Sequence, residues 1–372
     1  MIKVFIITER RADYSRFKPI MNLIKEENSL DYVLAVTGAH LKKEMGYTKT
    51  EILKDGFNIH YEIEMFSEDF DSGAVMVRAF SKVAEKVTYC LEDSKPDIIL
   101  AGFDIGANLA VTIAGAHMNI PIAHIQGGEV TGTIDESIRH AMTKFSHYHF
   151  ASNSDALERL VKLGEIRERI FNVGCPSIDA IKNTNDDPGI LKKYNLTENN
   201  FFILLQHPVT TEIKESKKQI QITLSAISKA NVNTLIILPN NDAGFTKIVE
   251  ELMNSKIKYV ESLGISDYIN LLKRSSGLIG NSSSGIHETS TFNIPTVNIG
   301  SRQNGRLRPD NVFDVDHNEK QIIYAIKKCL KFKSENRRVK NPYGDGNSSK
   351  RIIEIIKKID LSQKIIQKTI TY

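Results

Sequence analysis

The regular alternation of two kinds of segment is the feature that most constrains how this chain can fold. Short runs rich in apolar and β-branched residues recur at residues 3–7, 32–36, 97–102, 120–125, 147–152, 170–174, 201–206, 234–239, 258–262, 277–281 and 295–300. Most of these runs are continuously apolar, which is typical of strands buried on both faces. Helical patterns such as SRFKPIMNLIKEE and GANLAVTIAGAHM lie between them. The alternation predicts parallel sheets whose strands are connected by crossover helices.

The length of the chain predicts two domains. Its 372 residues exceed what a single hydrophobic core usually holds, and a polar segment with Pro and Gly at 182–200 separates two sets of apolar runs. We therefore predict an α/β protein with two Rossmann-like, doubly wound domains that face each other across a cleft. Residues 1–180 would form the N-terminal domain, residues 181–355 the C-terminal domain, and residues 356–372 a terminal helix and tail.

Composition argues against several classes of protein. The formal net charge is only +4 and the basic residues form no concentrated patch, so we expect no nucleic-acid partner. The cysteines Cys90, Cys175 and Cys329 lie far apart, which argues against a disulfide framework or a structural zinc site and fits a reducing cytoplasm. No apolar window approaches the roughly 18 residues that a membrane span needs. We predict a cytoplasmic protein without a membrane partner.

Polar loops follow the predicted strands, where ligands bind in sheets of this kind. The stretch GNSSSGIHE (280–288) follows a buried run and precedes a helix expected to begin near Ile286. Its backbone N–H groups and hydroxyls would bind a pyrophosphate, and the alternative is a serine cap on an ordinary helix. Glu288 fits a capping box or a contact with ribose hydroxyls. The candidate anion-binding residues are Ser282, Ser283, Ser284 and Gly285.

Other loops carry candidate charged groups. Arg302 and Arg306 in SRQNGR suit phosphate oxygens, unless they are ordinary surface arginines. His207 and Asp104 each follow a buried run, where a polar group is costly unless it is paired or used. The alternative is that His207 is a structural residue whose hydrogen bonds are made within the fold. The chain contains neither G-x-G-x-x-G nor G-x-x-x-x-G-K-[ST], so we expect neither a nicotinamide cofactor nor a P-loop.

The segment QGGEVTGTIDESIRH concentrates carboxylates beside two basic residues. Asp135 and Arg139 have helical spacing and share a face, as parts of a site or as a surface ion pair. His147 and His149 lie on one face of a predicted strand, but no third ligand is evident, so we predict no metal site.

These motifs together resemble a known family. The segments TERRADYS, GTIDESIRHA, GCPSID, HPVTTE, GNSSSGIHE and SRQNGR occur in the order seen in the hydrolysing UDP-N-acetylglucosamine 2-epimerases. That family includes the bacterial sialic and legionaminic acid enzymes and the epimerase half of the animal bifunctional enzyme. The resemblance implies the GT-B architecture, with the nucleotide mainly on the C-terminal domain and the sugar between the domains. It also implies catalysis without NAD or a metal.

The resemblance assigns roles residue by residue. Asp104 and Asp135 would be the acid and base carboxylates, and His207 would act at the leaving group. Arg139 is a further candidate for binding the substrate. The positions that match the nucleotide-binding motifs are Arg11, His207, Ser282, Ser283, Glu288 and Arg302.

The sequence departs from the family's motifs near the sugar. Ile105 and Ala107 stand where Arg and Glu are expected, and His287 replaces an arginine. Gln126 stands where the family has a glutamate that is a candidate base. Because glutamine cannot take a proton at neutral pH, that duty would pass to Asp135, Asp104 or Glu129. The replacement of Arg and Glu by Ile105 and Ala107 predicts a less polar sugar pocket, which would suit a 4-acetamido-6-deoxy sugar.

The implied function is the conversion of UDP-N-acetylglucosamine, or a close 2-acetamido UDP-sugar, to UDP and free N-acetylmannosamine through a 2-acetamidoglucal. The alternative substrate is UDP- or GDP-linked N,N'-diacetylbacillosamine, which would give 2,4-diacetamido-2,4,6-trideoxymannose. A glycosyltransferase on the same fold and a nucleotide-sugar binding protein are alternatives of other classes. We expect a homodimer or homotetramer.

Overall fold

The computed structural model describes residues 1–372 except 44–45, 67–71, 104–105, 240–241 and 372. It contains two parallel sheets, of seven and six strands. The first sheet has the spatial order β3 (Tyr61–Ile63), β2 (Leu30–Thr37), β1 (Ile2–Thr8), β4 (Ile98–Gly102), β5 (Ile122–Ile125), β6 (Tyr148–Ala151), β7 (Ile170–Asn172). The second has the order β10 (Tyr259–Val260), β9 (Thr234–Ile237), β8 (Phe202–Leu205), β11 (Gly277–Gly280), β12 (Thr296–Ile299), β13 (Val312–Val315).

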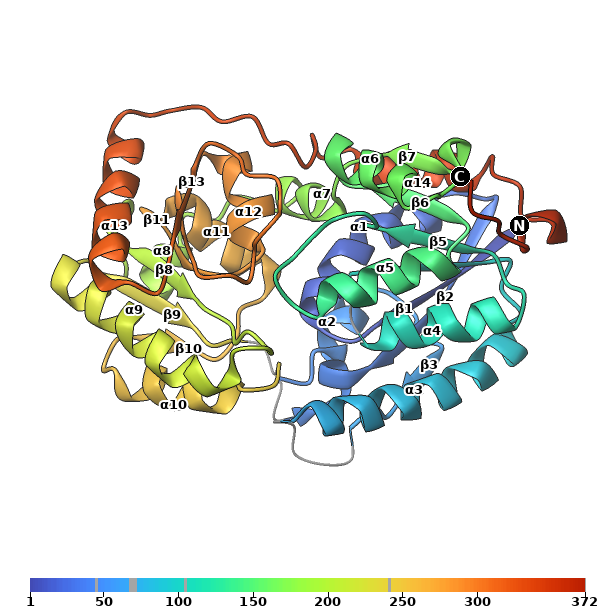
Figure 1. Cartoon of the computed structure of the whole chain (residues 1–372), viewed down its shortest axis with the longest axis horizontal. Coiled ribbons are helices and arrows are strands. Elements are labelled where there is room, and N and C mark those ends of the chain that lie inside the picture. The colour runs from blue at the N-terminus through green and yellow to red at the C-terminus, as the bar shows by residue number, and fades with distance from the viewer. Residues whose placement is uncertain (44–45, 67–71, 104–105, 240–241, 372) are drawn as a thin grey trace.

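Helices connect these strands and cover both sheets (Figure 1). The α-helices are α1 (Arg11–Glu26), α2 (Lys49–Lys54), α3 (Gly73–Ser94), α4 (Gly106–His117), α5 (Asp135–Phe145), α6 (Ser154–Lys162), α7 (Pro176–Lys182), α8 (Ile190–Lys193), α9 (Ser216–Ala230), α10 (Phe245–Asn254), α11 (Ile265–Arg274), α12 (Ser284–His287), α13 (Glu319–Ser334) and α14 (Ser348–Ile356). Short 3₁₀ turns are η1 (Gly38–Leu41), η3 (Arg167–Arg169), η4 (Ile213–Glu215), η5 (Thr289–Phe292) and η6 (Gln363–Ile365). No helix among these described residues is long and apolar enough to cross a bilayer.

Both sheets are doubly wound, as the sequence predicts. In each sheet the first strand lies in the middle, and the chain first winds to one edge and then returns to wind to the other. Every strand pair is parallel; β1, for example, pairs with β2 from Ile2 opposite Leu30 to Thr8 opposite Val36. Successive side chains point to opposite faces, so Val4 and Ile6 pack with α1 whereas Phe5 and Ile7 pack with α3 and α4. Continuous apolar runs were therefore a sound indication of buried strands.

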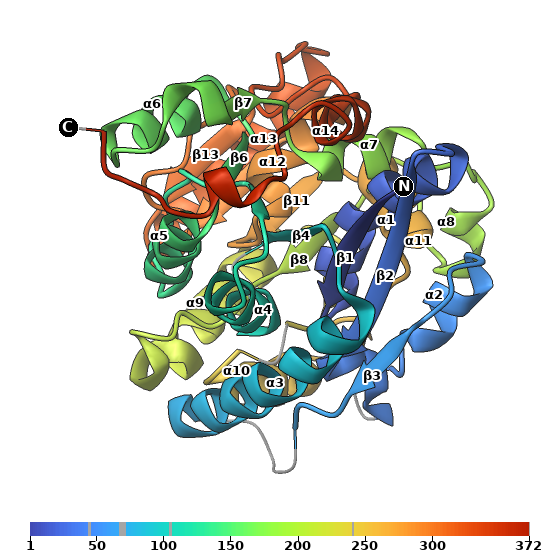
Figure 2. The same ribbon diagram turned by 90° about the vertical axis from the view of Figure 1, so that its right-hand side faces the viewer.

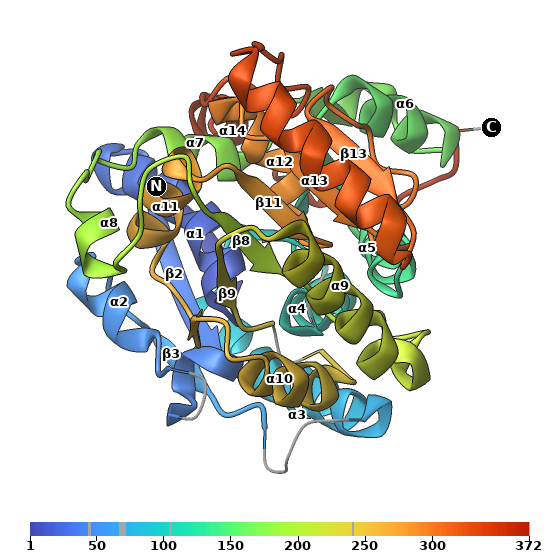
Figure 3. The same ribbon diagram turned by 90° about the vertical axis from the view of Figure 1, so that its left-hand side faces the viewer.

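Helices cover each face of the second sheet as well. Side chains of α9, α10 and α13 pack together with alternate residues of β8 and β9 on one face, the side toward the viewer in Figure 3. The other face is covered by residues of α7, α8, α11 and α12. The sequence reading did not predict β3 or β13. Both are edge strands, short and only partly buried, so they lack the continuous apolar run that marks the central strands.

The last helix returns to the first sheet. Ile352, Ile353 and Ile356 of α14 share a hydrophobic cluster with α1 and with β1, and Figure 2 shows α14 above the first sheet, near α7. No local sequence pattern indicates where this helix packs. The division of the chain at residue 180 stays a prediction.

Candidate functional site

Loops at the carboxyl ends of the two sheets meet between the domains. The loops after β1 and β5 contact those after β9, β10, β11 and β12, through Arg10 with Asp242, Arg11 with Ser262, and Glu129 with His287 and Arg306. We call this set of loops the interdomain region. It is the place where doubly wound sheets bind ligands, because the polar backbone ends and the connecting loops gather there.

The loop after β11 is built by close backbone packing. Gly280 has φ +134°, and a Cβ at this position would lie 2.1 Å from the carbonyl oxygen of Leu205, so only glycine fits. The next residue, Asn281, exchanges hydrogen bonds with the backbone of His207 (2.7 and 2.9 Å). This amide therefore fixes the loop after β8 against the loop after β11.

The helix at the serine-rich stretch begins earlier than the sequence predicts. The helix was expected to begin near Ile286, whereas α12 begins at Ser284 and ends at His287. The hydroxyl of Ser282 accepts a hydrogen bond from the Ser284 N–H at 3.3 Å. Gly285 lies against Thr296, and a Cβ there would come within 2.6 Å of that side chain. The fold thus explains Gly285 by packing, while Ser282 and Ser283 remain at the start of the turn.

Glu288 is not part of a capping box, and that expectation was wrong. It follows α12 instead of lying in its first turn, and its carboxylate accepts a hydrogen bond from the Ser284 hydroxyl at 2.6 Å. Tyr268 also contacts the Ser284 hydroxyl. Burial raises the pKa of Glu288, against a lowering influence from Ser284 and Arg16. A buried carboxylate thus faces the serine-rich turn.

Two arginines from different sheets share one carboxylate. Arg302 and Arg10 approach the two oxygens of Asp242 at 3.6 and 3.5 Å, and Arg302 also donates to the backbone oxygen of Asn281 at 3.2 Å. Burial, with Arg302 and Arg10 nearby, holds the pKa of His207 well below its usual range. His207 is therefore neutral at neutral pH. Sequence reasoning found Arg302 and His207 but missed Arg10 and Asp242.

Arg11 lies at the edge of the same region. Its guanidinium contacts Ser262, which follows β10, and the carboxylate of Glu51 in α2. Both partners come from outside the serine-rich turn. The structure thus connects Arg11 with the second sheet but does not bring it into contact with Ser282 or Ser283.

Glu129 is the centre of a buried network. One carboxylate oxygen accepts hydrogen bonds from Gln126 (3.0 Å) and Ser152, and the other lies 3.2 Å from His287 and 3.4 Å from Arg306. Burial opposes the charge, but His287 and Arg306 outweigh it and hold the pKa of Glu129 well below its usual range. Burial lowers the pKa of His287 to about 4, so this ring is neutral at neutral pH. Arg306 is therefore the main group that stabilises the negative charge of Glu129.

Gln126 and Arg139 support this network. Gln126 adopts φ +63° at the end of β5, and its side-chain oxygen accepts a hydrogen bond from Arg16 at 3.0 Å. Arg139 is buried and donates to the backbone oxygen of Glu129 at 2.8 Å. Its guanidinium thus holds the loop that carries Glu129. Arg16, which sequence reasoning missed, also lies 5.2 Å from the ring centre of Phe103.

The two predicted acid–base carboxylates have different outcomes. Asp135 is the first residue of α5, is half-buried and is close enough to Arg10 to stabilise that guanidinium. Asp104 lies outside the described residues. A third carboxylate, Glu9, follows β1 directly, is 6% exposed and accepts a hydrogen bond from the Ala107 N–H at 3.1 Å. The sequence signal for Glu9 was present, since it is a charged residue immediately after a buried strand.

The histidines of β6 belong to another part of the fold. His149 lies 2.9 Å from Glu165, whose carboxylate also pairs with Lys368 of the C-terminal tail at 2.6 Å. His147 contacts the backbone of Ile366 at 3.2 Å. Both histidines therefore help to fix the tail to the first sheet.

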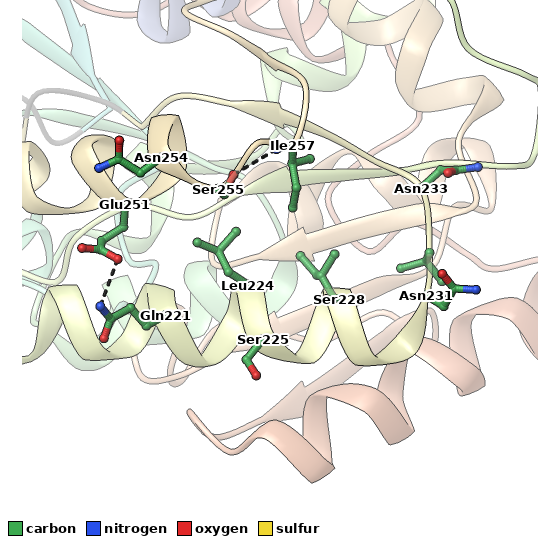
Figure 4. Close-up of a pocket in the computed structure, with 12 residues that line it drawn as sticks. Gln221, Leu224, Ser225, Ser228, Asn231, Asn233, Glu251, Asn254, Ser255 and Ile257 are labelled. Atoms are coloured by element: carbon green, nitrogen blue, oxygen red, sulfur yellow. Dashed lines mark hydrogen bonds between the residues drawn. The ribbon is translucent and has the colours of Figure 1, made fainter.

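A hollow of about 540 Å³ lies between α9 and α10 (Figure 4). Its lining includes Asn231 and Asn233, just before β9, and Ser255 and Ile257, just before β10. It is therefore at the amino ends of these strands, opposite the interdomain region. We assign the candidate site to the interdomain region, because the buried charged groups gather there.

Comparisons with known proteins identify the family to which the chain is similar. Residues 22–357 match the family described as UDP-N-acetylglucosamine 2-epimerase. The chain is 34% identical to a UDP-N,N'-diacetylbacillosamine 2-epimerase (hydrolyzing) from Legionella pneumophila, over 100% of this chain and 99% of that one. It is 30% identical to a UDP-N-acetylglucosamine 2-epimerase from Neisseria meningitidis, over 96% of this chain and 95% of that one. The crystal structure of a UDP-GlcNAc 2-epimerase from Neisseria meningitidis bound to UDP-GlcNAc has the same two-sheet fold, with TM-score 0.82 at 18% identity over 96% and 100% of the chains.

Proposed function

Because the chain belongs to the UDP-N-acetylglucosamine 2-epimerase family, we propose that it is a hydrolysing 2-epimerase of a 2-acetamido UDP-sugar. In the proposed reaction UDP leaves C1 as a proton is lost from C2, giving a 2-acetamidoglucal. Water then adds to the double bond with the opposite configuration at C2, and the products are UDP and the free manno sugar. Relatives with 30–34% identity include enzymes named for UDP-N-acetylglucosamine and for diacetylbacillosamine.

One observation carries this proposal. The cations Arg10 and Arg302, on opposite sheets, converge on Asp242 beside the neutral His207. A diphosphate that displaced the Asp242 carboxylate would take over both guanidinium groups, whose planar donors suit phosphate oxygens. The neutral His207 ring would donate a hydrogen bond to the departing UDP. Asp135 and Glu288 provide carboxylates within the same region, as acid–base chemistry at the sugar and binding of the ribose require.

Two UDP-sugars are candidate substrates for the proposed reaction. The first is UDP-N-acetylglucosamine, and the second is UDP-linked N,N'-diacetylbacillosamine, on which the 34% identical Legionella enzyme is named to act. Ala107 provides no polar side chain where the family's motif has a glutamate, which favours the second substrate. The carboxylate of Glu9 contacts the Ala107 N–H, however, so this part of the pocket retains an acidic group.

The test is turnover in D₂O with each UDP-sugar, and with the GDP-linked analogue, in the presence of EDTA and without NAD. We expect free manno sugar and UDP, with one deuterium at C2, detected by proton NMR. Product without deuterium at C2 would exclude elimination. Formation of an epimerised UDP-sugar without release of UDP would show a non-hydrolysing enzyme, and activity that disappeared with EDTA and returned with zinc or manganese would show a metal enzyme.

A further inference from the structure

Glu9 occupies the topological switch point of the first sheet. The strands β1 and β4 are neighbours, but the chain winds from β1 toward β2 and β3 on one side and from β4 toward β5, β6 and β7 on the other. The connections leave in opposite directions, which opens a crevice outside the carboxyl ends of the two strands. Glu9 is the first residue after β1, and its side chain reaches the first turn of α4, which follows β4.

The surrounding backbone leaves room for this carboxylate. Gly38, at φ +58°, lies so close that a Cβ there would be 2.5 Å from Cγ of Glu9. A Cβ on Gly106 would be 3.9 Å from Oε2, the oxygen that accepts the Ala107 N–H. The Glu9 side chain thus lies between two glycines, Gly38 and Gly106, which leave space for its carboxylate. Among the residues that the structure describes, no hydrogen bond is formed to the other oxygen, Oε1.

The charges that face Glu9 leave it able to exchange a proton. Burial raises the pKa of Glu9 to about 7; Arg10 and the Ala107 N–H lower it, and Asp13 and Asp242 raise it further. Asp13 is itself fully engaged, since it accepts hydrogen bonds from the Thr8 hydroxyl (2.6 Å) and from the backbone N–H of Glu9 and Arg10 (2.7 and 3.0 Å). A carboxylate of this kind is present in both protonation states near neutral pH, as proton transfer requires.

Other buried carboxylates of the interdomain region are less suited to this role. Glu129 is held in its ionised form by Arg306; its Oε1 accepts hydrogen bonds from Gln126 and Ser152, and its Oε2 faces His287 and Arg306. Glu288 accepts a hydrogen bond from Ser284 and lies on the second sheet's side. Gln126 cannot take a proton. Glu9 combines burial, a position at the switch point and an oxygen that is available to a ligand.

We propose that Glu9 is the base that removes the C2 proton of the sugar. This inference rests on the proposed function. Oε1 takes the proton, the C2–H electron pair becomes the C1=C2 double bond, and the C1–O bond breaks with its electron pair remaining on UDP. Glu9 then releases its proton to water before the next turnover. In the hydration step another acid protonates C2 from the opposite face, and water supplies the hydroxyl at C1 and a proton that restores that acid.

Glu9→Gln is the decisive variant, because its amide oxygen can still accept the Ala107 N–H while the side chain cannot take a proton. We expect kcat for UDP-sugar consumption to fall by about 10²-fold or more, with an unchanged Kd for UDP by calorimetry. Hydration of added 2-acetamidoglucal in the presence of UDP should stay within about threefold of the wild-type rate, because that step does not use the Glu9 carboxylate. Asn318→Ala, which removes a side-chain hydrogen bond to the first turn of the remote helix α13, is the control for a weakened contact of the kind that Glu9 makes with α4, and it should leave kcat unchanged.

The wild-type pH profile provides a test that needs no substitution. The acidic limb of kcat/KM should fall near pH 7, and Glu9→Asp, which keeps a carboxylate but shortens it by one methylene, should lower kcat less than Glu9→Gln does. A Glu9→Gln enzyme that binds UDP and turns over at the wild-type rate would overturn the inference but leave the proposed function intact. Equal losses in elimination and in glucal hydration would also overturn it. A wild-type protein that consumes no UDP-sugar would instead reject the proposed function.

Discussion

Nε2 of His287 lies 3.2 Å from the carboxylate of Glu129, which connects the last residue of α12 to the loop after β5. Arg306, after β12, approaches the same oxygen at 3.4 Å. Two sheets that share no strand are thus joined by a buried carboxylate and two nitrogen-bearing side chains. Because its negative charge is needed to pair with Arg306, Glu129 is better suited to holding the two halves together than to taking a proton.

Glu129→Gln should therefore destabilise the protein. The substitution removes the Glu129 carboxylate from beside the guanidinium of Arg306, whose side chain is 8% exposed. Loss of one partner of a buried ion pair typically costs about 3–5 kcal/mol, and we expect a fall of this size in the free energy of unfolding in urea. Glu335→Gln, which removes an exposed pair with Arg337, is the control and should cost less than about 1 kcal/mol. Equal effects of the two variants would contradict this role of Glu129.

The central strands could be predicted from sequence because their apolar runs reflect burial on both faces. Val4 to Ile7, for example, are all fully buried although they point alternately to different helices. The edge strand β13 could not be recognised in the same way, since Val312–Val315 includes an exposed aspartate and partly buried neighbours. The position of α14 depends on packing against α1, which no local pattern records.

The loops that form the candidate site could be predicted from the sequence, but the pairs of residues that make contact within it could not. Polar residues after buried runs identified the interdomain region, because parallel strands place their carboxyl ends at one edge. The pairing of Arg10 with Asp242 joins positions 232 residues apart, and only the folded arrangement brings them together. Helical spacing placed Asp135 and Arg139 on one face of α5, but it could not indicate that the guanidinium of Arg139 donates to the backbone oxygen of Glu129.

The serine-rich turn gives a prediction about nucleotide affinity. Ser282→Ala combined with Ser283→Ala should weaken UDP binding, because each hydrogen bond to a charged group contributes roughly 1.5–3 kcal/mol. Calorimetry should show a Kd raised at least about tenfold, since 1.4 kcal/mol corresponds to that factor. Ser255→Ala, in the hollow between α9 and α10, should leave the Kd unchanged. An unaltered UDP affinity in a folded double variant would show that this turn does not hold the diphosphate.

Asp135→Asn should lower kcat by about 10²-fold or more, which is the usual effect of removing a general acid or base. The Kd for UDP should change little, because the proposed nucleotide contacts are mainly on the second sheet. Asp155→Asn is a matched control, since Asp155 is also in the first turn of a helix but pairs with Arg159 near the surface. A near-normal rate for Asp135→Asn would remove this residue from the mechanism.

The same substitution at Asp104 follows from the sequence alone, since this position lies outside the described residues. Asp104→Asn should again lower kcat by about 10²-fold or more while UDP binding persists. Single-turnover measurements with UDP-sugar and with added glucal would show which half of the reaction each aspartate serves. If Asp104→Asn kept the wild-type rate in both halves, the acid–base pair would have to be sought among Glu9 and Asp135.

His40 gives a prediction about pH and stability. It is fully buried between the hydroxyls of Thr8 (3.0 Å) and Thr48 (2.6 Å), and burial lowers its pKa to about 4, while Asp13 raises it and Arg11 lowers it further. The unfolded chain, with an ordinary histidine pKa of about 6.5, binds a proton in the window from about pH 6.5 to 4 where the folded protein does not. Stability therefore falls as the pH falls through this window and is constant again below it.

The free energy of unfolding should fall by about 2 kcal/mol between pH 7 and pH 5. Over this interval the histidine of the unfolded chain binds a proton, whereas the buried His40 of the folded protein does not. His287 and His147, whose pKa values burial likewise lowers to about 4, add to the total dependence. His40→Gln keeps a side chain that can both donate and accept, but it cannot titrate. Urea unfolding at the two pH values should show a smaller loss of stability for His40→Gln than for the wild type. If both proteins lost the same free energy, His40 would have to bind a proton in the folded state as readily as in the unfolded chain, which would contradict this prediction.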